Sequence, residues 1–231
     1  LRNGNIIPAN LKESDYVCYG INDHLRPFLQ MNTPRLSLPA EDLGLFTDLY
    51  ELTMSQAFLR QGMTATATFS LFTRTYPSNR GYFISAGLED VLDYLSDLNF
   101  SGEAITYLRS TGIFSKDFLE YLRDVRFTGS VRAIPEGRLY FTDEPVVEIT
   151  APLIEAQLAE TFIINQVNLQ SMLATKAARC VWAAQGRGIA DFASRRTHGT
   201  DAALKTARAS YIAGFTSTSN VLAANLYGIP P

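Results

Sequence analysis

Cysteine, histidine and tryptophan are scarce in this sequence, with two, two and one copies in 231 residues. Cys18 and Cys180 lie far apart and form neither a Cys-x-x-Cys pair nor a cysteine–histidine cluster. This pattern argues against a disulfide framework and against a structural zinc site. We therefore predict a reducing, cytoplasmic location and no metal site within the chain.

An excess of one charge and a long apolar run are also missing. Twenty Lys and Arg against 23 Asp and Glu leave a net charge of −3, so no global basic field would hold a nucleic-acid backbone. The longest uncharged stretch of an apolar region, residues 161–175, is too short to span a bilayer and contains Asn and Gln. We expect no nucleic-acid partner and no membrane-spanning helix. A hydrophobic share of 46% instead indicates a globular protein of one or two domains.

Proline marks the N-terminal part of the chain. Four of the ten prolines fall in the first 40 residues, which also lack any sustained period of 2 or 3.6. Little core can be built from such a segment. We therefore interpret residues 1–42 as an extension, residues 43–150 as a first domain and residues 151–231 as a second, incomplete domain.

Periodic patterns follow the extension. Strict alternation over residues 64–71 predicts a strand with one buried face, and apolar residues spaced i, i+3, i+4, i+7 predict an amphipathic helix over 87–98. Ser101 and Ser115 stand where N-caps of two shorter helices are expected. Residues 131–149, with β-branched pairs between prolines and a glycine, predict two or three strands.

A long helix is predicted between Pro152 and Gly186, because no glycine or proline lies between them and apolar residues recur at helical spacing. If unbroken, this helix is about nine turns long; the alternative is an interruption at the β-branched pair Ile163 and Ile164. We assign Trp182 to the core.

The last part of the chain has a different order of elements. Residues 189–194 predict a short strand, Thr200 is expected to cap a helix that ends at Gly214, and a small helix closes at Gly228. This order is typical of the beginning of a parallel sheet or barrel. Because a parallel strand needs neighbours, we expect the chain to stop inside a domain.

The segment at the carboxyl end of the predicted strand is the main candidate site. Open α/β sheets and barrels bind ligands at this end of their strands. Arg195 and Arg196 offer guanidinium groups for a carboxylate or phosphate, and Phe192 offers a ring face for a planar ligand. The alternative is that both arginines pair with surface carboxylates. His198 is either an acid or base, or a loop residue without a catalytic role.

Two further segments each allow a ligand-binding and a purely structural interpretation. The hydroxyl-rich residues 216–220 precede a short helix, whose N-terminus would take an anion or be capped by Ser217 or Ser219. Asp48 and Tyr50 begin a helix, where the pattern alone favours a cap and a core residue. Spacing does not decide the role of residues 216–220.

Six blocks of the sequence, in this order, resemble signatures of the nicotinate phosphoribosyltransferase family. They are Thr47–Met54, Gly81–Glu89, Pro135–Gly137, Ala174–Arg179, Asp191–Gly199 and Gly214–Ala223. The resemblance covers roughly residues 45–231, and the ordered set is far more specific than any single block.

The resemblance implies an α/β fold, with an N-terminal α/β sandwich domain followed by a linking helix and the beginning of an irregular type II phosphoribosyltransferase α/β barrel. It implies a homodimer with sites between subunits. The implied ATP-dependent, ligase-type enzyme of NAD biosynthesis makes nicotinate mononucleotide and pyrophosphate from nicotinate and phosphoribosyl pyrophosphate, with Mg²⁺ and with ATP as a co-substrate.

The resemblance also implies a set of substrate-binding residues. They are Tyr50, Phe192, Arg195, Arg196 and Ser219, with Asp48, Ser217 and Thr218 as secondary candidates. Tyr50 would reach across the dimer and stack on the pyridine, Phe192 would cover the opposite face, and Arg195 would meet the carboxylate. The related nicotinamide enzyme has an aspartate where Ser219 aligns. Because an aspartate repels a nearby carboxylate, Ser219 favours the acid over the amide.

One part of the family pattern is not found. The family's phosphohistidine block, which couples ATP to the reaction, is expected after Pro231, so no catalytic residue is identified within this chain. We therefore expect a fragment, or one piece of a split protein, without turnover by itself. The alternative is a non-catalytic interaction module that dimerises with an intact relative and modulates it.

Overall fold

A four-stranded antiparallel sheet forms one layer of the protein. The computed structural model describes residues 16–20 and 38–231, and the remainder of the extension lies outside these residues. The strands, in spatial order, are β1 (Val17–Gly20), β4 (Ser130–Ala133), β6 (Pro145–Pro152) and β2 (Thr66–Phe72). Because β1 pairs with β4, residues 17–20 of the predicted extension belong to the sheet. The domain boundaries at 42/43 and 150/151 stay predictions.

The predicted alternation is present in β2, where Phe69 and Leu71 are partly buried and Thr66, Thr68 and Ser70 are exposed. One face of the sheet therefore packs on helices and the other carries polar side chains. Three strands, β4, β5 (Leu139–Tyr140) and β6, confirm the prediction for 131–149. β5 pairs with β3 (Phe83–Ile84) in a separate two-stranded sheet.

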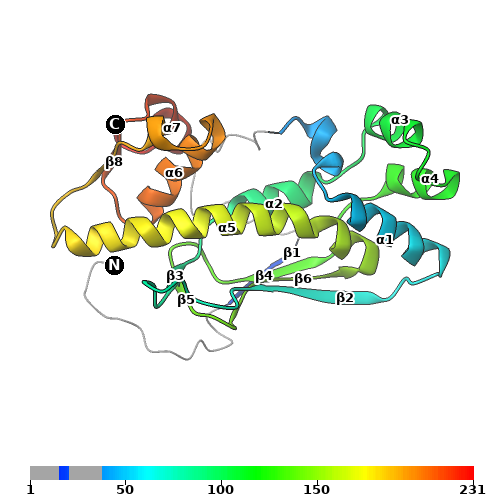
Figure 1. Ribbon diagram of the computed structural model, residues 1–231, viewed down its shortest axis with the longest axis horizontal. Coiled ribbons are helices and arrows are strands. Elements are labelled where there is room, and N and C mark those ends of the chain that lie inside the picture. The colour runs from blue at the N-terminus through cyan, green and yellow to red at the C-terminus, as the bar shows by residue number, and fades with distance from the viewer. Residues whose placement is uncertain (1–15, 21–37) are drawn as a thin grey trace.

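The long helix α5 (Leu153–Ala183) runs the length of the molecule over this sheet (Figure 1). Its 31 residues are unbroken, so the alternative with an interruption at Ile163 and Ile164 is wrong. Ile163 is buried in the main core and Ile164 is 44% exposed, so the pair simply occupies two faces of one helix. The core assignment of Trp182 is also wrong, because its side chain is 69% exposed. No helix among residues 16–20 and 38–231 combines the length and apolar character needed to cross a membrane.

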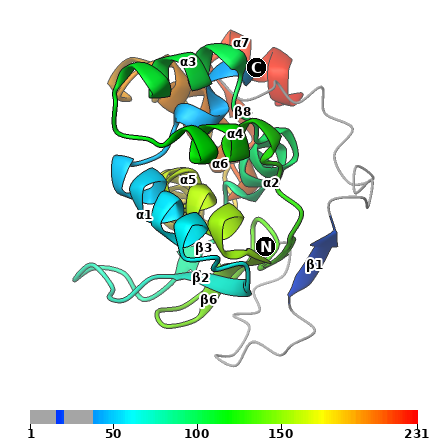
Figure 2. The ribbon, with the colours of Figure 1, turned by 90° about the vertical axis from the view of Figure 1, so that its right-hand side faces the viewer.

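The described helices lie on one side of the sheet (Figure 2). The short 3-10 helix η2 (Ala40–Leu45) precedes α1 (Leu49–Arg60), and both α1 and α2 (Leu88–Asp97) pack against α5. Two further helices, α3 (Gly102–Ser110) and α4 (Lys116–Asp124), form a second core with α1 and the start of α5, farther from the sheet. The predicted caps are confirmed: Ser101 accepts a hydrogen bond from the Ala104 amide, and Ser115 from the Phe118 amide. The amphipathic helix predicted over 87–98 is α2.

The C-terminal elements form the start of a parallel sheet. They are β7 (Ala190–Asp191), the 3-10 helix η3 (Ser194–Arg196), α6 (Thr200–Ile212), β8 (Ser217–Thr218) and α7 (Val221–Tyr227). β7 and β8 pair in parallel, with α6 as the crossover between them, so the predicted α/β order is confirmed. β7 is shorter than the strand predicted over 189–194. Gly199, rather than Thr200, holds the N-cap position of α6, and Gly228 ends α7 with φ 62° as predicted.

Buried charges join α6 to α2. Arg208 is 5% exposed and pairs with Glu89 and with Glu136, whose Oε2 lies 2.7 Å from Nη2. Glu136 also accepts hydrogen bonds from the backbone amides of Gly87 and Leu88 at the start of α2. A second buried pair, between Lys205 and Asp90, lies beside it. These ion pairs fix the C-terminal elements against the first part of the chain.

Candidate active site

The carboxyl end of β7 is held by a buried carboxylate. Asp191 is 3% exposed and accepts hydrogen bonds from the Ala193 amide and from Oγ1 of Thr218, each at 2.9 Å. The Ser219 amide donates to the Asp191 carbonyl at 2.8 Å. Asp191 therefore shapes the ends of both parallel strands, and the next residue, Phe192, leaves the sheet with its ring 64% exposed.

Both candidate arginines lie in η3, directly after this strand end, and both are exposed. Neither Arg195 nor Arg196 pairs with a carboxylate of the described residues, so the alternative in which they form surface ion pairs is not seen. Two exposed guanidinium groups that no described carboxylate neutralises therefore follow Phe192 in the chain, and such groups suit an anion.

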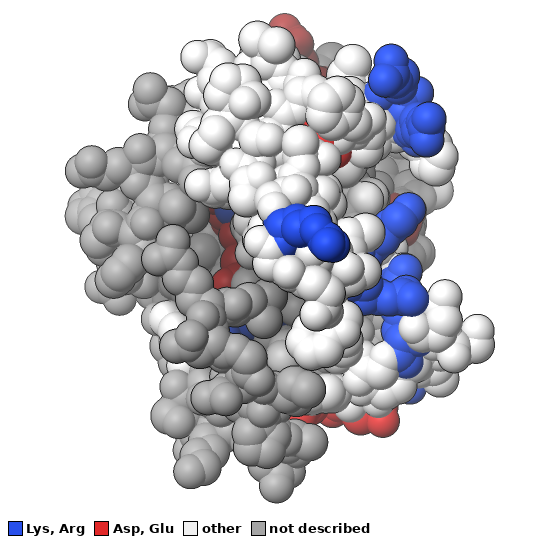
Figure 3. Space-filling model, turned by 90° about the vertical axis from the view of Figure 1, so that its left-hand side faces the viewer, with Lys and Arg blue, Asp and Glu red and all other residues white. Residues whose placement is uncertain are grey.

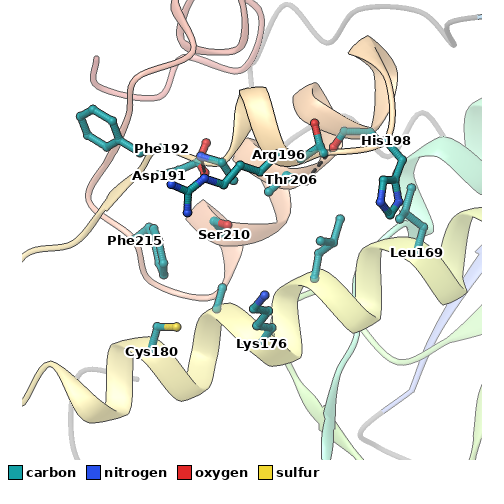
Figure 4. A pocket seen from close by; sticks show the side chains of 15 residues that line it. Leu169, Lys176, Cys180, Asp191, Phe192, Arg196, His198, Thr206, Ser210 and Phe215 are labelled. Atoms are coloured by element: carbon teal, nitrogen blue, oxygen red, sulfur yellow. Dashed lines mark hydrogen bonds between the residues drawn. The ribbon is translucent and has the colours of Figure 1, made fainter.

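A cavity of about 560 Å³ opens between the C-terminal half of α5, the β7–η3 segment and α6 (Figure 4). Phe192, Arg196 and His198 line it, whereas Arg195 and Ser219 do not. Its apolar wall comes from Leu169, Leu173, Ala177 and Phe215. Volume, apolar walls and a few polar groups are the usual properties of a small-molecule site.

The hydroxyl-rich segment 216–220 is divided between structural and exposed roles. Thr218 is 1% exposed, and its hydroxyl is already bonded to Asp191. Ser217 lies in β8, and Ser219 is exposed next to the end of β7. The expectation that Ser217 or Ser219 caps the following helix is wrong, because Oδ1 of Asn220 accepts from the Ala223 amide at 3.0 Å.

Tyr50 lies at the other end of α5. Its hydroxyl donates to Oε1 of Glu160 at 2.9 Å, and its side chain is 47% exposed rather than part of the core. The hydrogen bond to Glu160, followed by partial burial, raises the pKa of Tyr50 to about 12, so the phenol stays protonated at neutral pH. Asp48 holds the N-cap position without capping, and its carboxylate accepts from Thr161 at 3.2 Å.

Within one chain, the structure does not bring Tyr50 to the cavity. Glu160, its partner, precedes the cavity residue Lys176 by sixteen residues of unbroken helix, which corresponds to about 24 Å. Phe192 and Arg196 meet at the cavity, and Tyr50 and Asp48 form a separate polar cluster with Thr161 and Glu160 of α5.

Sequence reasoning missed three side chains of these regions: Lys176 and Ser210 in the cavity, and Glu160 beside Tyr50. Helical spacing in the sequence could have indicated Lys176 and Ser210. Leu169, Leu173, Lys176 and Cys180 share one face of α5, and Ala202, Thr206 and Ser210 recur every four residues on α6. These stripes mark the facing sides of the two helices.

Positive charge gathers at this end of the molecule. In Figure 3, Lys and Arg side chains are more prominent than Asp and Glu on the described surface of the end that carries the cavity. Among the described residues there is no group of three or more His, Cys, Asp or Glu that could hold a metal ion. The site is therefore suited to an anionic ligand.

Comparison with known proteins places this arrangement among relatives. Residues 45–168 match a family model described as the nicotinate phosphoribosyltransferase N-terminal domain. A nicotinate phosphoribosyltransferase of Mycobacterium tuberculosis is 55% identical over 187 residues, covering 81% of this chain and 40% of the relative. One of Bacillus subtilis is 42% identical over 191 residues, covering 82% and 39%.

Solved structures show the same fold. The crystal structure of human nicotinic acid phosphoribosyltransferase matches with a TM-score of 0.73 and 35% identity, over 80% of this chain and 38% of that chain. A nicotinate-nucleotide pyrophosphorylase of Pyrococcus furiosus, with a TM-score of 0.63 and 22% identity, shares the fold. The chain spans about 40% of the length of the curated relatives it matches.

Proposed function

The chain belongs to the nicotinate phosphoribosyltransferase family, and we propose that it supplies the pyridine-binding part of an enzyme of NAD biosynthesis. This enzyme forms nicotinate mononucleotide and pyrophosphate from nicotinate and phosphoribosyl pyrophosphate. The supporting observation is the exposed ring of Phe192 at the carboxyl end of β7, followed by two arginines that pair with no carboxylate of the described residues. A planar ring with a carboxylate matches both features.

The second face of the pyridine is covered by Tyr50 of a second copy of the chain. Tyr50 and Phe192 are at opposite ends of α5, so one chain cannot place both rings on one ligand. The exposed ring of Tyr50, held through its hydroxyl by Glu160, is available for such a contact. We therefore propose a homodimer with two shared sites.

Selection of the acid over the amide follows from charge. A guanidinium of the Arg195–Arg196 pair binds the carboxylate, and Ser219, next to the end of β7, adds no negative charge there. An aspartate at this position would repel a carboxylate but accept a hydrogen bond from an amide. The secondary candidates are positioning residues at most, namely Asp48, Ser217 and Thr218. The Thr218 hydroxyl donates a hydrogen bond to the Asp191 carboxylate.

The displacement of pyrophosphate by the pyridine nitrogen needs no side chain that reacts covalently with the sugar. Displacement of pyrophosphate from C1 of the sugar builds positive charge on the sugar, so the protein must align the ring nitrogen and exclude competing orientations. Mg²⁺ would neutralise the departing pyrophosphate, and ATP hydrolysis would be coupled through the phosphohistidine. The described residues contain no cluster of three or more His, Cys, Asp or Glu that could hold a metal ion, and the Asp191 carboxylate already accepts two hydrogen bonds. We therefore assign no residue of this chain to Mg²⁺.

We propose that this chain has no turnover by itself, because it spans about 40% of the length of its relatives. We also propose that the enzyme acts in the cytoplasm. The second candidate function is a non-catalytic module that binds and modulates an intact relative. The exposed apolar side chains of Val221 and Leu222 on α7, 77% and 54% exposed, favour a partner at this end in either case.

Reconstitution tests the proposal. The chain is co-expressed with the remaining C-terminal part of the Mycobacterium tuberculosis relative and assayed with nicotinate, phosphoribosyl pyrophosphate, Mg²⁺ and ATP. We expect turnover from the pair and none from the chain alone. Tyr50→Ala should raise the KM for nicotinate far more than that for phosphoribosyl pyrophosphate, while Tyr107→Ala, an exposed tyrosine on α3, should change neither.

Two results would contradict the proposal. Normal turnover by the purified chain would show that the chain is a complete enzyme. Equal losses for both substrates in Tyr50→Ala would remove the stacking role. Inhibition of an intact relative by the chain, without reconstituted turnover, would favour the non-catalytic module instead.

A further inference from the structure

A short chain of hydrogen bonds joins the interior of the protein at α5 to the exposed ring of Tyr50. Nε2 of Gln157, a residue that is 4% exposed, donates to Oε2 of Glu160 at 3.0 Å, about one turn further along the helix. Oε1 of Glu160 accepts the hydrogen bond from the Tyr50 hydroxyl at 2.9 Å. Each oxygen of Glu160 therefore has its own partner, one buried and one at the surface.

The bond to Glu160 restricts the ring of Tyr50. A tyrosine ring turns about two side-chain bonds, and an exposed ring exchanges rotamers within picoseconds to nanoseconds unless a contact holds it. Within residues 16–20 and 38–231, no other aromatic ring stacks on Tyr50. The hydrogen bond to Glu160 is therefore the directional contact that fixes the outer end of the ring, while 47% of the side chain stays exposed.

The backbone that carries Tyr50 is held by the next residue of α5. Oγ1 of Thr161 accepts a hydrogen bond from the Asp48 amide at 3.3 Å and lies 2.7 Å from Oε1 of the buried Glu51. Asp48 and Glu51 flank Tyr50 at the start of α1. Consecutive residues of α5 therefore fix this tyrosine at both ends, with Thr161 at the start of α1 and Glu160 at the hydroxyl.

A purely structural role explains the Tyr50–Glu160 bond poorly. α1 already packs on α5 through the buried side chains of Leu52 and Leu158, so one more hydrogen bond at the surface adds little to that contact. An aromatic ring that is held by its hydroxyl and still half exposed is instead suited to a flat ligand, because the side chain is ordered before the ligand arrives.

We propose that Glu160 is a positioning residue, which is itself held by Gln157 and which fixes the ring of Tyr50 in the orientation that covers the pyridine in the site of a second copy of the chain. This inference rests on the proposed function and adds to it the residues that order the tyrosine before the pyridine binds. Glu160 acts only through Tyr50. Its effect is therefore expected in the KM for nicotinate, and not in kcat or in the KM for phosphoribosyl pyrophosphate.

The first test uses the purified chain with isotope-labelled tyrosine rings. Nuclear magnetic resonance follows the Tyr50 signal, which is assigned by its loss in Tyr50→Phe. We expect Glu160→Ala to shift this signal and to increase rotamer exchange of the ring. Glu160→Gln should leave both close to those of the unaltered chain, because its amide oxygen can accept the same hydrogen bond. Glu120→Ala, which removes an exposed carboxylate of α4, is the matched control.

The second test is steady-state kinetics of the chain reconstituted with the C-terminal part of the Mycobacterium tuberculosis relative. Glu160→Ala should raise the KM for nicotinate about three- to tenfold, the range expected when one side chain must be ordered on binding. Tyr50→Phe should raise it by the same factor. The double variant should raise it by no more than either single change, because both changes remove one bond. Glu160→Gln should restore the KM of the unaltered chain.

Contrary results are distinct for each step. An unchanged Tyr50 signal in Glu160→Ala would overturn the inference, and so would additive effects of Tyr50→Phe and Glu160→Ala on the KM for nicotinate. A fall in kcat, or a Glu160→Gln variant that resembles Glu160→Ala, would also overturn it, because positioning through a hydrogen bond predicts neither. Absence of turnover with the unaltered chain would refute the proposed function alone, and the spectra would still decide whether Glu160 holds Tyr50.

Discussion

Removal of the guanidinium of Arg208 tests how the C-terminal elements are fixed to the rest of the protein. The side chain of Arg208 is 6% exposed and bridges Glu89 on α2 and Glu136, which also caps α2. Arg208→Met keeps most of the apolar stem and deletes the charge. Two carboxylates that face one buried cation would then lose it together.

The expected cost can be worked out from the surroundings of each carboxylate. Deletion of one partner of a buried ion pair typically costs about 3–5 kcal/mol. Glu136 would keep two backbone donors, at 2.6 and 3.0 Å, and the side chain of Glu89 is 29% exposed and can be hydrated. Both facts lower the cost, so we expect a loss of about 3 kcal/mol in the free energy of unfolding.

Urea unfolding followed by far-ultraviolet circular dichroism measures this loss. The control is Arg132→Met, which breaks a pair with Glu148 on the polar face of the sheet, where the side chains are 36% and 18% exposed. Such a pair is worth about 1 kcal/mol or less. If Arg208→Met lost no more stability than Arg132→Met, the idea that buried charges fix α6 against α2 would be refuted.

Three further changes have expected outcomes. Ser115→Ala should cost about 1 kcal/mol of unfolding free energy, because it deletes the α4 cap, and an equal result for Ser110→Ala would contradict this. Trp182 should fluoresce like indole in water and be quenched freely by acrylamide, since it is 69% exposed; a protected, blue-shifted emission would disagree. Burial raises the pKa of Glu51, although hydrogen bonds from two threonines lower it, so the folded state favours the protonated acid and stability falls as pH rises through the raised pKa. Glu51→Gln should therefore reduce the loss of unfolding free energy as the pH rises above the ordinary range of a glutamate, and an unchanged pH dependence would exclude this residue as its source.

Local patterns predicted features that neighbouring residues decide, and failed where tertiary packing decides. Ser101 and Ser115 signal their helices because the capping bond lies within three residues of the sequence. The alternative with an interruption at Ile163 is wrong because packing of that side chain against the sheet outweighs its low helix propensity. Trp182 was assigned to the core by its apolar character, which says nothing of which face of α5 it occupies.

The candidate site was predictable only where its residues are adjacent in sequence. Phe192 and Arg196 share one loop, so their proximity follows from the chain itself. Lys176 and Ser210 come from two helices whose contact depends on how α6 docks, and the charges that dock it are separated by up to 119 residues. Tyr50 lies far from the cavity of its own chain, and no pattern within one chain indicates the second copy that we propose.

The continuity of α5 sets a strict rule for changes in its length. Each added residue advances the helix by about 1.5 Å and turns everything beyond it by about 100°. A single insertion between Glu160 and Lys176 would therefore rotate the ammonium group away from Ser210, even if every side chain were retained. Evolution can lengthen this connection without such a loss only in steps close to whole turns, which makes the number of residues here as constrained as their identity.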